Sequence, residues 1–256
     1  MEPIHLVRFQ LHHESGYGVV VDGQVHRLAA DPWMPKPGPA VAPLEKVRLL
    51  APCQPSKIIA VGLNYAAHAS EHGNTVPAEP RIFLKPPSSV VGPDAVIHYP
   101  EHLSQRVEHE AELAVVVGRR AYRVPREQAF DFVLGYTCGN DVTARDLQQR
   151  DVQWTRSKSF DTFCPLGPWI VTELDITDLA IRCRVNGALR QESRTSKMLF
   201  RVDELIAYIS AVMTLEPGDV ILTGTPEGVS PLLPGDSVTV EIEGIGTLWN
   251  KVDRTG

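Results

Sequence analysis

Residues 107–117 have the sequence VEHEAELAVVV, and the rest of the chain is organised around this stretch. Val, Leu and Ala dominate its second half, and it contains no Gly or Pro, so it predicts a β-strand. Alternate residues of a strand share one face, which puts Glu108, Glu110 and Glu112 on one side and His109 on the other. Because apolar residues occupy both faces after Glu112, we expect this end of the strand to be buried on both sides.

The three glutamates need a partner if the strand is buried. Burying a row of carboxylates costs free energy unless something neutralises the charge. A divalent cation is one such partner, since carboxylate oxygens suit Mg²⁺, Mn²⁺ or Ca²⁺. The alternative is an edge strand whose acidic face lies in water, and this stretch alone leaves both alternatives open.

Length and composition favour a globular protein. The 256 residues carry a formal net charge of -6 and are 43% hydrophobic and 22% charged, which suits one large domain or a domain with a smaller module. Without a basic block, nucleic acid and anionic membranes are not expected partners. No apolar stretch is long enough to span a bilayer, and the N-terminus lacks the features of a secretory signal.

The cysteines are typical of a reducing compartment. They are widely spaced and form no C-x-x-C motif, so disulfides and zinc ligation are not expected. They are Cys53, Cys138, Cys164 and Cys183. We therefore expect free thiols in a cytoplasmic protein.

Residues 1 to about 50 predict a small β-rich module. Its strands are expected at residues 4–11, 17–21 and 24–28. Asp22-Gly23 between the last two is a strong signal for a two-residue hairpin. Residues 32–43 are rich in Pro and predict a linker or loop, and residues 44–50 a short helix or strand.

Residues 57–252 predict a larger domain in which short strands alternate with turns. Strands are expected at 57–62, 81–87, 134–139, 169–173, 180–185, 220–223, 237–243 and 247–252. Helices are expected at 63–73, 125–132, 143–150 and 202–213, and an irregular segment at 154–168. In the first helix Asn64 is the predicted N-cap and Gly73 the C-terminal stop, with His68 and Glu71 as neighbours at i, i+3. The pattern favours an α+β, β-rich fold over alternating βαβ units.

Five motifs occur in an order and spacing that resemble the fumarylacetoacetate hydrolase family. They are GLNY at 62–65 with His68 and Glu71; FLKP at 83–86; EAEL at 110–113; NDVTARDLQ at 140–148; and KSF at 158–160 with LTGTP at 222–226. The resemblance covers about residues 57–252. It is nearest to short bacterial members and to the branch of acylpyruvate hydrolases, oxaloacetate decarboxylases and 2-hydroxyhepta-2,4-diene-1,7-dioate isomerases. It implies a mixed β-roll as the catalytic domain, preceded by the small module at 1–50.

The resemblance also implies a metal site. Its E-x-E pair corresponds to Glu110 and Glu112, and its N-D aspartate corresponds to Asp141. These residues would hold one Mg²⁺ or Mn²⁺, for which Ca²⁺ can substitute, with water or substrate completing the coordination. Glu108 would then be a bystander. The longer hydrolases add an upstream carboxylate that has no clear counterpart here, which argues against fumarylacetoacetate itself as the substrate.

Further residues are implied around the metal. His68, Glu71 and Lys158 correspond to catalytic positions, and Arg145, Gln148, Lys85 and Thr225 to positions near the substrate. The alternatives are a surface i, i+3 pair for His68 and Glu71, a snorkelling Lys158, and a surface ion pair for Arg145.

The implied chemistry begins with a 2-oxo acid that chelates the metal, a Lewis acid. C–C hydrolysis, isomerisation and decarboxylation all build up a metal-bound enolate, which Lys158 would stabilise. His68, made more basic by Glu71, would deprotonate water or a substrate carbon beneath a lid helix.

We therefore expect a Mg²⁺-dependent enzyme, a homodimer, that acts on acylpyruvates or unsaturated 2-oxo or 2-hydroxy dicarboxylates in the breakdown of aromatic compounds. Three alternatives remain: an oxaloacetate decarboxylase, a catalytically silent metal- and ligand-binding protein of the same fold, and a purely structural β-rich domain with an acidic surface.

Overall fold

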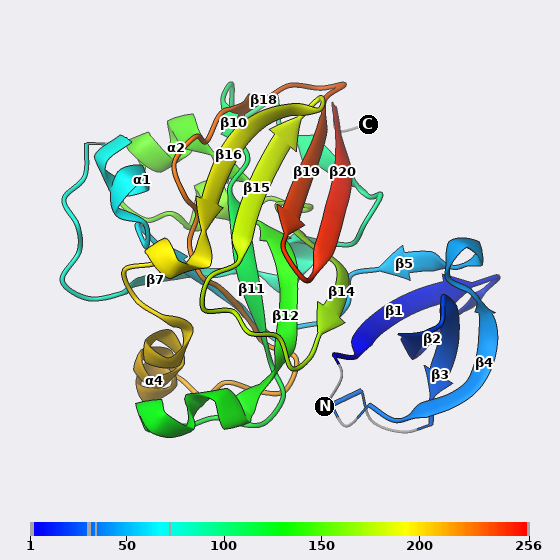
Figure 1. Cartoon of the computed structure of the whole chain (residues 1–256). Helices are drawn as coiled ribbons and strands as arrows, with labels where there is room; N and C mark the ends of the chain where they lie inside the picture. Colours follow the sequence, from blue (N-terminus) through cyan, green and yellow to red (C-terminus); the bar gives the residue numbers. More distant parts are fainter. Residues whose placement is uncertain (1–2, 30–31, 34, 72, 255–256) are drawn as a thin grey trace.

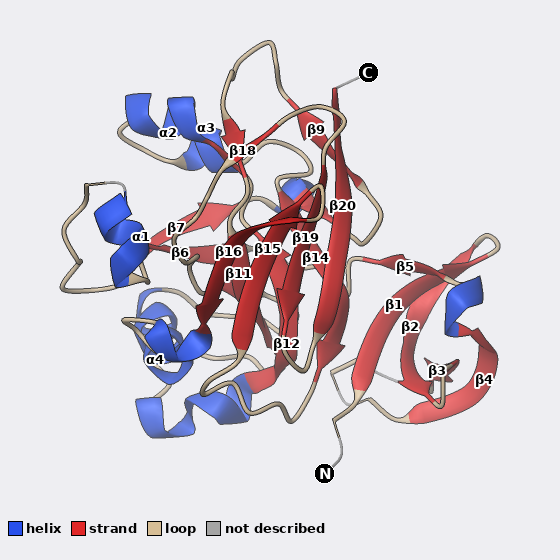
Figure 2. Ribbon diagram, turned by 45° about the horizontal axis from the view of Figure 1, so that its top comes forward, coloured by secondary structure: helices blue, strands red, loops and turns tan. Residues whose placement is uncertain are grey.

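The computed structural model describes residues 3–29, 32–33, 35–71 and 73–254. Strands dominate these ranges and form three sheets. The helices α1 (Ala66–Glu71), α2 (Arg145–Arg150) and α4 (Val202–Val212) lie on the side away from the N-terminal strands (Figure 1). The view coloured by secondary structure shows how short the helices are beside the sheets (Figure 2). The predicted α+β, β-rich fold is confirmed.

The largest sheet has the strand order β4-β3-β2-β1-β14-β12-β11-β17-β6-β7. The larger predicted domain contributes β6 (Ile58–Gly62), β7 (Arg81–Lys85), β11 (Ala111–Val117), β12 (Val133–Asn140), β14 (Cys164–Val171) and β17 (Val220–Leu222). The short strand β8 (Val90–Val91) pairs with β14. Strand β11 lies between β12 and β17 and is buried at every residue, so the predicted burial on both faces is confirmed.

The acidic stretch is divided into two strands, and the prediction of one continuous strand is wrong. Its first part, β10 (Val107–Glu108), pairs with β13 (Thr143–Ala144) and β18 (Pro231–Leu232) in a separate small sheet. Its second part is β11. At the break, the backbone N–H of Glu110 donates to Oδ1 of Asn140, 3.0 Å away, and makes no bond within a strand ladder.

The third sheet covers one face of the largest sheet, as the strands in front of β11 and β12 in Figure 1 show. Its order is β16-β15-β19-β20-β9. Its strands are β9 (Val96–Tyr99), β15 (Ala180–Val185), β16 (Ala188–Arg194), β19 (Ser237–Ile242) and β20 (Gly246–Arg254). The turn at Asn186-Gly187 joins β15 to β16. Val115 of β11, Ile181 of β15 and Val240 of β19 belong to one apolar cluster, so the main core lies between these two sheets.

The N-terminal module continues the largest sheet. It consists of β1 (His5–Leu11), β2 (Glu14–Val21), β3 (Gln24–Leu28), β4 (Pro37–Pro43), the 3₁₀ turn η1 (Leu44–Lys46) and β5 (Arg48–Leu50). Strand β1 pairs with β2 and β5 inside the module and with β14 outside it. The Asp22-Gly23 hairpin is confirmed.

The Pro-rich segment is partly a strand, so the prediction of a linker or loop is wrong for residues 37–43. Proline cannot donate to a ladder, and it is tolerated here because β4 is the edge strand of its sheet. Met34, inside the predicted linker, lies outside the described residues, as do Met1 and Glu2.

Short helices connect the strands. The α-helices are α1 (Ala66–Glu71), α2 (Arg145–Arg150), α3 (Thr155–Lys158) and α4 (Val202–Val212), and the further 3₁₀ turns are η2 (Pro87–Ser89), η3 (Arg126–Phe132) and η4 (Thr195–Lys197). Three predictions need correction: the segment after Pro125 is 3₁₀, the helix predicted from Thr143 begins at Arg145, and the segment 154–168 contains α3 and most of β14. No helix in the described ranges is long and apolar enough to cross a membrane. All four cysteines are buried free thiols, as predicted.

Candidate metal centre

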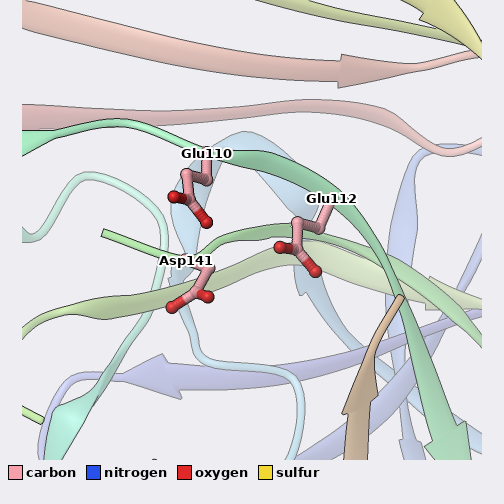
Figure 3. Close-up of side chains that lie close together, drawn as sticks. All are labelled: Glu110, Glu112 and Asp141. Atoms are coloured by element: carbon pink, nitrogen blue, oxygen red, sulfur yellow. The ribbon is translucent and has the colours of Figure 1, made fainter. Parts of the chain in front are cut away.

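Three carboxylates meet where β11 begins and β12 ends. Ala111 is paired with Asn140, so Glu110 and Glu112 flank the end of β12, and the N–H of Asp141 donates to the carbonyl of Glu110 at 2.9 Å. One oxygen from each of Glu110, Glu112 and Asp141 lies within 4.8 Å of the other two. Figure 3 shows the three side chains lying close together.

The donor set fits a hard divalent cation. All three ligand candidates are buried carboxylates, and oxygen donors of this kind suit Mg²⁺, Mn²⁺ or Ca²⁺. Carboxylates packed this closely away from water repel one another, so a bound cation would relieve a real electrostatic cost. The alternative of an acidic face in water is wrong, because Glu110, Glu112 and Asp141 are each less than 5% exposed.

Buried lysine and arginine side chains already offset part of the negative charge of the three carboxylates. Lys158 Nζ lies 2.7 Å from Glu110 Oε2 and 2.7 Å from Asp141 Oδ2. Lys85 Nζ donates to Asp141 Oδ1 at 2.6 Å and also to the carbonyl of Lys158. Arg145 Nη2 donates to Glu110 Oε1. Each cation is therefore held by a member of the carboxylate cluster.

The local charges shift the pKa values in opposite directions. Burial would raise the pKa of Glu110, but Lys158 and Arg145 hold it well below its usual range. Burial, with the nearby charges of Asp141 and Glu110, raises the pKa of Glu112 well above its usual range. Burial opposes the charge on Lys158, yet the pKa of this lysine is raised because Asp141 and Glu110 favour its ammonium form.

Glu112 differs from the other two ligand candidates. Among the described residues, no lysine or arginine lies within ion-pair distance of its carboxylate. Its Oε2 instead accepts a hydrogen bond from the backbone N–H of Gly224 at 2.6 Å. Glu112 is therefore the carboxylate that gains most from a cation.

A cavity of about 250 Å³ opens beside the carboxylates. Most of the predicted site residues line it: His68, Glu110, Glu112, Asp141, Arg145, Gln148, Lys158 and Thr225. A larger cavity of about 570 Å³ lies beside Tyr136 and Asp203 and contains none of the predicted site residues.

His68 and Glu71 form the predicted pair on α1. His68 Nδ1 lies 3.4 Å from Glu71 Oε2, and the imidazole is buried. The N–H of Gly228 donates to both oxygens of Glu71, at 3.1 and 3.3 Å, which connects α1 to the loop after β17. The pair is therefore more than a surface contact between neighbours on a helix.

Asn64 is not the N-cap of this helix, because α1 begins at Ala66. Its amide instead donates to the carbonyls of Phe200 and Thr223, and its Oδ1 accepts from the N–H of Phe200 at 2.7 Å. These long-range bonds fasten the segment before α1 to the body of the protein.

Three of the four predicted substrate-binding residues line the cavity, and the fourth does not. Arg145 and Gln148 line the cavity and bond to each other. Thr225 also lines it, but its hydroxyl donates to the carbonyl of Ala111 at 2.9 Å. Lys85 lies outside the lining and contacts Asp141. Their substrate-binding roles stay predictions.

Sequence reasoning missed Gln191 on β16. Its buried amide donates to Thr225 Oγ1 and to the carbonyl of Pro226, each at 2.8 Å. Its Oε1 accepts from the N–H of Ala111 at 3.0 Å and contacts His109 Nδ1 at 3.0 Å. No local pattern marks it, because its partners are distant in sequence.

Two aromatic rings pack beside Lys158. Lys158 Nζ lies 5.1 Å from the centroid of the Phe83 ring, and Phe83 makes an edge contact with Trp154. Gly62 permits this packing, because a Cβ there would lie 2.6 Å from the Trp154 ring. The Phe83 ring therefore covers one side of the ammonium group.

Residues 57–253 match the family described as fumarylacetoacetate (FAA) hydrolase C-terminal, and residues 4–52 match the family described as Rv2993c-like, N-terminal. The chain is 49% identical over 219 residues to oxaloacetate tautomerase fahd2, mitochondrial, of Xenopus laevis, an alignment covering 80% of this chain and 68% of that protein.

Solved structures show the same similarity. A 5-carboxymethyl-2-hydroxymuconate delta-isomerase from Mycobacterium smegmatis superposes with a TM-score of 0.91 and 49% identity, over 98% of this chain and 100% of that one. A maleylpyruvate hydrolase from Sphingobium sp. SYK-6, in complex with manganese (II) ion and pyruvate, gives a TM-score of 0.82 and 34% identity over 98% and 100%.

Proposed function

The chain belongs to the fumarylacetoacetate hydrolase family of enzymes, and on this basis we propose that it uses a divalent cation to shift protons on 2-oxo acids. The observation that carries the proposal is the buried cluster of Glu110, Glu112 and Asp141 with Lys158 between two of its members. The cluster supplies three oxygen ligands and a cation within one cavity. The Sphingobium relative was solved in complex with manganese (II) ion and pyruvate, which supports both the divalent cation and the 2-oxo acid substrate of the proposal.

Mg²⁺ is the proposed metal and Mn²⁺ its closest substitute, held by Glu110, Glu112 and Asp141. When bound, such a cation acts as a Lewis acid that polarises a substrate carbonyl. Lys158 and Arg145 add positive charge to the same cavity, where the carboxylate of a 2-oxo acid would bind.

His68 is the proposed base. It lines the cavity, and its Nδ1 lies 3.4 Å from Glu71 Oε2, so the carboxylate can orient the imidazole to take a proton from the carbon next to the substrate ketone. The enolate that results carries negative charge on oxygen. The ammonium of Lys158, which lies 5.1 Å from the centroid of the Phe83 ring, stabilises that charge. Returning the proton at another atom completes an isomerisation or tautomerisation.

The relatives favour a proton shift as the first reaction to test. The two with 49% identity are named a tautomerase and a delta-isomerase, whereas the hydrolase has 34% identity. Cleavage of a C–C bond by water is the second candidate, because the same base can activate water. Decarboxylation of oxaloacetate, a role in the breakdown of aromatic compounds, a cytoplasmic location and a homodimer stay predictions.

The test is a comparison of substrates with EDTA-treated protein, before and after Mg²⁺ is added. The substrates are the enol of oxaloacetate, an acylpyruvate and an unsaturated 2-oxo dicarboxylate, each followed by its ultraviolet absorbance. We expect Mg²⁺-dependent turnover that Glu112→Gln abolishes and that His68→Asn lowers at least 100-fold, with His102→Asn, an exposed histidine, as the control.

Two results would count against the proposal. Turnover that persists fully in EDTA would separate the activity from the cation site. Binding of Mg²⁺ and oxalate without turnover of any substrate would favour the alternative of a catalytically silent binding protein.

A further inference from the structure

The guanidinium of Arg145 is divided between two carboxylates. Its Nε donates to Glu108 Oε2 at 2.6 Å, and its Nη2 donates to Glu110 Oε1. Nε and Nη2 lie on the same edge of the group, the edge that can hold a single carboxylate through both of its oxygens. Here that bidentate edge is split, and Nη1 goes to Gln148.

Glu108 is at least as deeply buried as the proposed metal ligands. It is fully buried, and its second oxygen accepts from Nε of Arg106 at 2.6 Å. Arg106 is a weaker partner because its side chain is 52% exposed, whereas that of Arg145 is 3% exposed. The buried charge of Glu108 is therefore matched mainly by Arg145.

Because Glu108 takes part of the Arg145 guanidinium, Glu110 is bound by only one of its nitrogens. With Glu108 holding Nε, Glu110 receives one N–H from Arg145, and its Oε2 accepts from Lys158, which also donates to Asp141. Without the charge of Glu108, the whole edge of Arg145 could close on Glu110 through both oxygens. Glu110 would then be neutralised and turned away from the cation position.

We propose that Glu108 is a positioning residue for metal binding, which restrains Arg145 so that Glu110 remains available as a ligand. The inference rests on the proposed function, because it assumes that the cluster binds a divalent cation. It replaces the interpretation of Glu108 as a bystander.

The first test measures the Mn²⁺ affinity of the full chain after EDTA treatment, from the electron paramagnetic resonance signal of free Mn²⁺. We expect Glu108→Gln to weaken binding at least tenfold, the usual effect of losing a residue that orients a ligand. Arg106→Gln is the matched control, because it removes the exposed partner of Glu108 and keeps Arg145 in place. Its affinity should stay within threefold of the wild type.

The second test asks whether the effect passes through Arg145. In an Arg145→Gln background, the added Glu108→Gln substitution should change the Mn²⁺ affinity less than threefold. A tenfold loss in that background would overturn the proposal, since Glu108 would then act only by its negative charge. Wild-type affinity in the Glu108→Gln single variant would also overturn it.

Two controls keep the outcomes separate. If the wild type binds no Mn²⁺, the proposed function fails; if only the effect of Glu108→Gln is absent, this inference alone fails. If circular dichroism shows that Glu108→Gln does not fold, Glu108→Asp takes its place, because its shorter side chain withdraws the carboxylate from Arg145. A loss of at least threefold then supports the proposal, and unchanged affinity overturns it.

Discussion

His109 shows how strongly a single buried residue depends on its neighbours. It is fully buried at the break between β10 and β11, with Nδ1 3.0 Å from Gln191 Oε1 and Nε2 2.9 Å from Ser230 Oγ. Since Oε1 can only accept, Nδ1 carries the hydrogen and Nε2 accepts from Ser230, which is the neutral imidazole. Burial lowers the pKa of His109 from 6.5 to about 4.

This shift predicts a pH dependence of stability. Between pH 6.5 and about 4 the unfolded chain binds a proton at His109 that the folded chain does not, so the free energy of unfolding falls as pH drops. The loss is about 3 kcal/mol across that window, with full stability above it. His109→Gln should show a shallower decline than the wild type in urea unfolding with EDTA present. Equal slopes would contradict this, and exposed His13→Gln is the control.

At the residue scale the sequence predicts the three carboxylates of the proposed metal site, but not the residues that hold them in position. Glu110, Glu112 and Asp141 stand in motifs with fixed spacing, and the structure brings their carboxylates together. The roles of Glu108 and Gln191 depend on partners far away in the chain, and alternation along a strand gives only the face on which each residue lies.

The side chain of Gln191 on β16 links the third sheet to the acidic stretch by hydrogen bonds. The amide of Gln191 satisfies backbone groups of Ala111 and Pro226 that are buried away from water. Replacing it by an apolar side chain leaves those groups without partners, each of which costs free energy.

We therefore expect Gln191→Leu to lower the free energy of unfolding by about 2–4 kcal/mol. Glu192→Gln is the matched control, because the neighbouring Glu192 is exposed and forms a surface ion pair with Arg182, which is worth about 1 kcal/mol or less. Urea unfolding of the three proteins measures both effects. Equal losses in the two variants would show that the buried amide has no special weight.

At the element scale the hairpins and the long apolar strands were predictable. Asp22-Gly23 and Asn186-Gly187 both make the turns that their sequences favour, because these residues tolerate positive φ. The strand formed by Pro37–Pro43 was not predictable, since local rules forbid proline inside a sheet and only the tertiary structure shows that β4 is an edge. The break between β10 and β11 depends equally on a distant residue, Asn140.

At the scale of the whole molecule, the N-terminal module shares a sheet with the larger domain. His5 pairs with Val171 and Leu6 with Ile170, and His5 stacks on Trp169 with ring centroids 5.0 Å apart. Leu6 is fully buried in a cluster that also contains Ala114 of β11. The families matched at 4–52 and 57–253 divide the sequence, and the pairing of β1 with β14 crosses that division.

This continuity predicts that both parts unfold together. The whole chain should unfold in one calorimetric transition, and Leu6→Ala should shift it to lower temperature. We expect the free energy of unfolding to fall by about 2–4 kcal/mol, because the shorter side chain leaves a cavity in the core. Two transitions, of which only one moves, would show that the module unfolds independently. The sequence could not decide this, because no local pattern indicates that β1 pairs with a strand about 160 residues away.

The most direct test of the cation site is a thermal-unfolding titration of EDTA-treated protein with Mg²⁺, with oxalate, and with both. Oxalate resembles the chelating end of a 2-oxo acid enolate, and a ligand of the folded state raises the melting temperature. The buried cluster of Glu110, Glu112 and Asp141 predicts that the two together raise it far more than the sum of their separate effects, and that Glu112→Gln removes the excess. No shift with either ligand or with both would contradict a site for a metal and a 2-oxo acid.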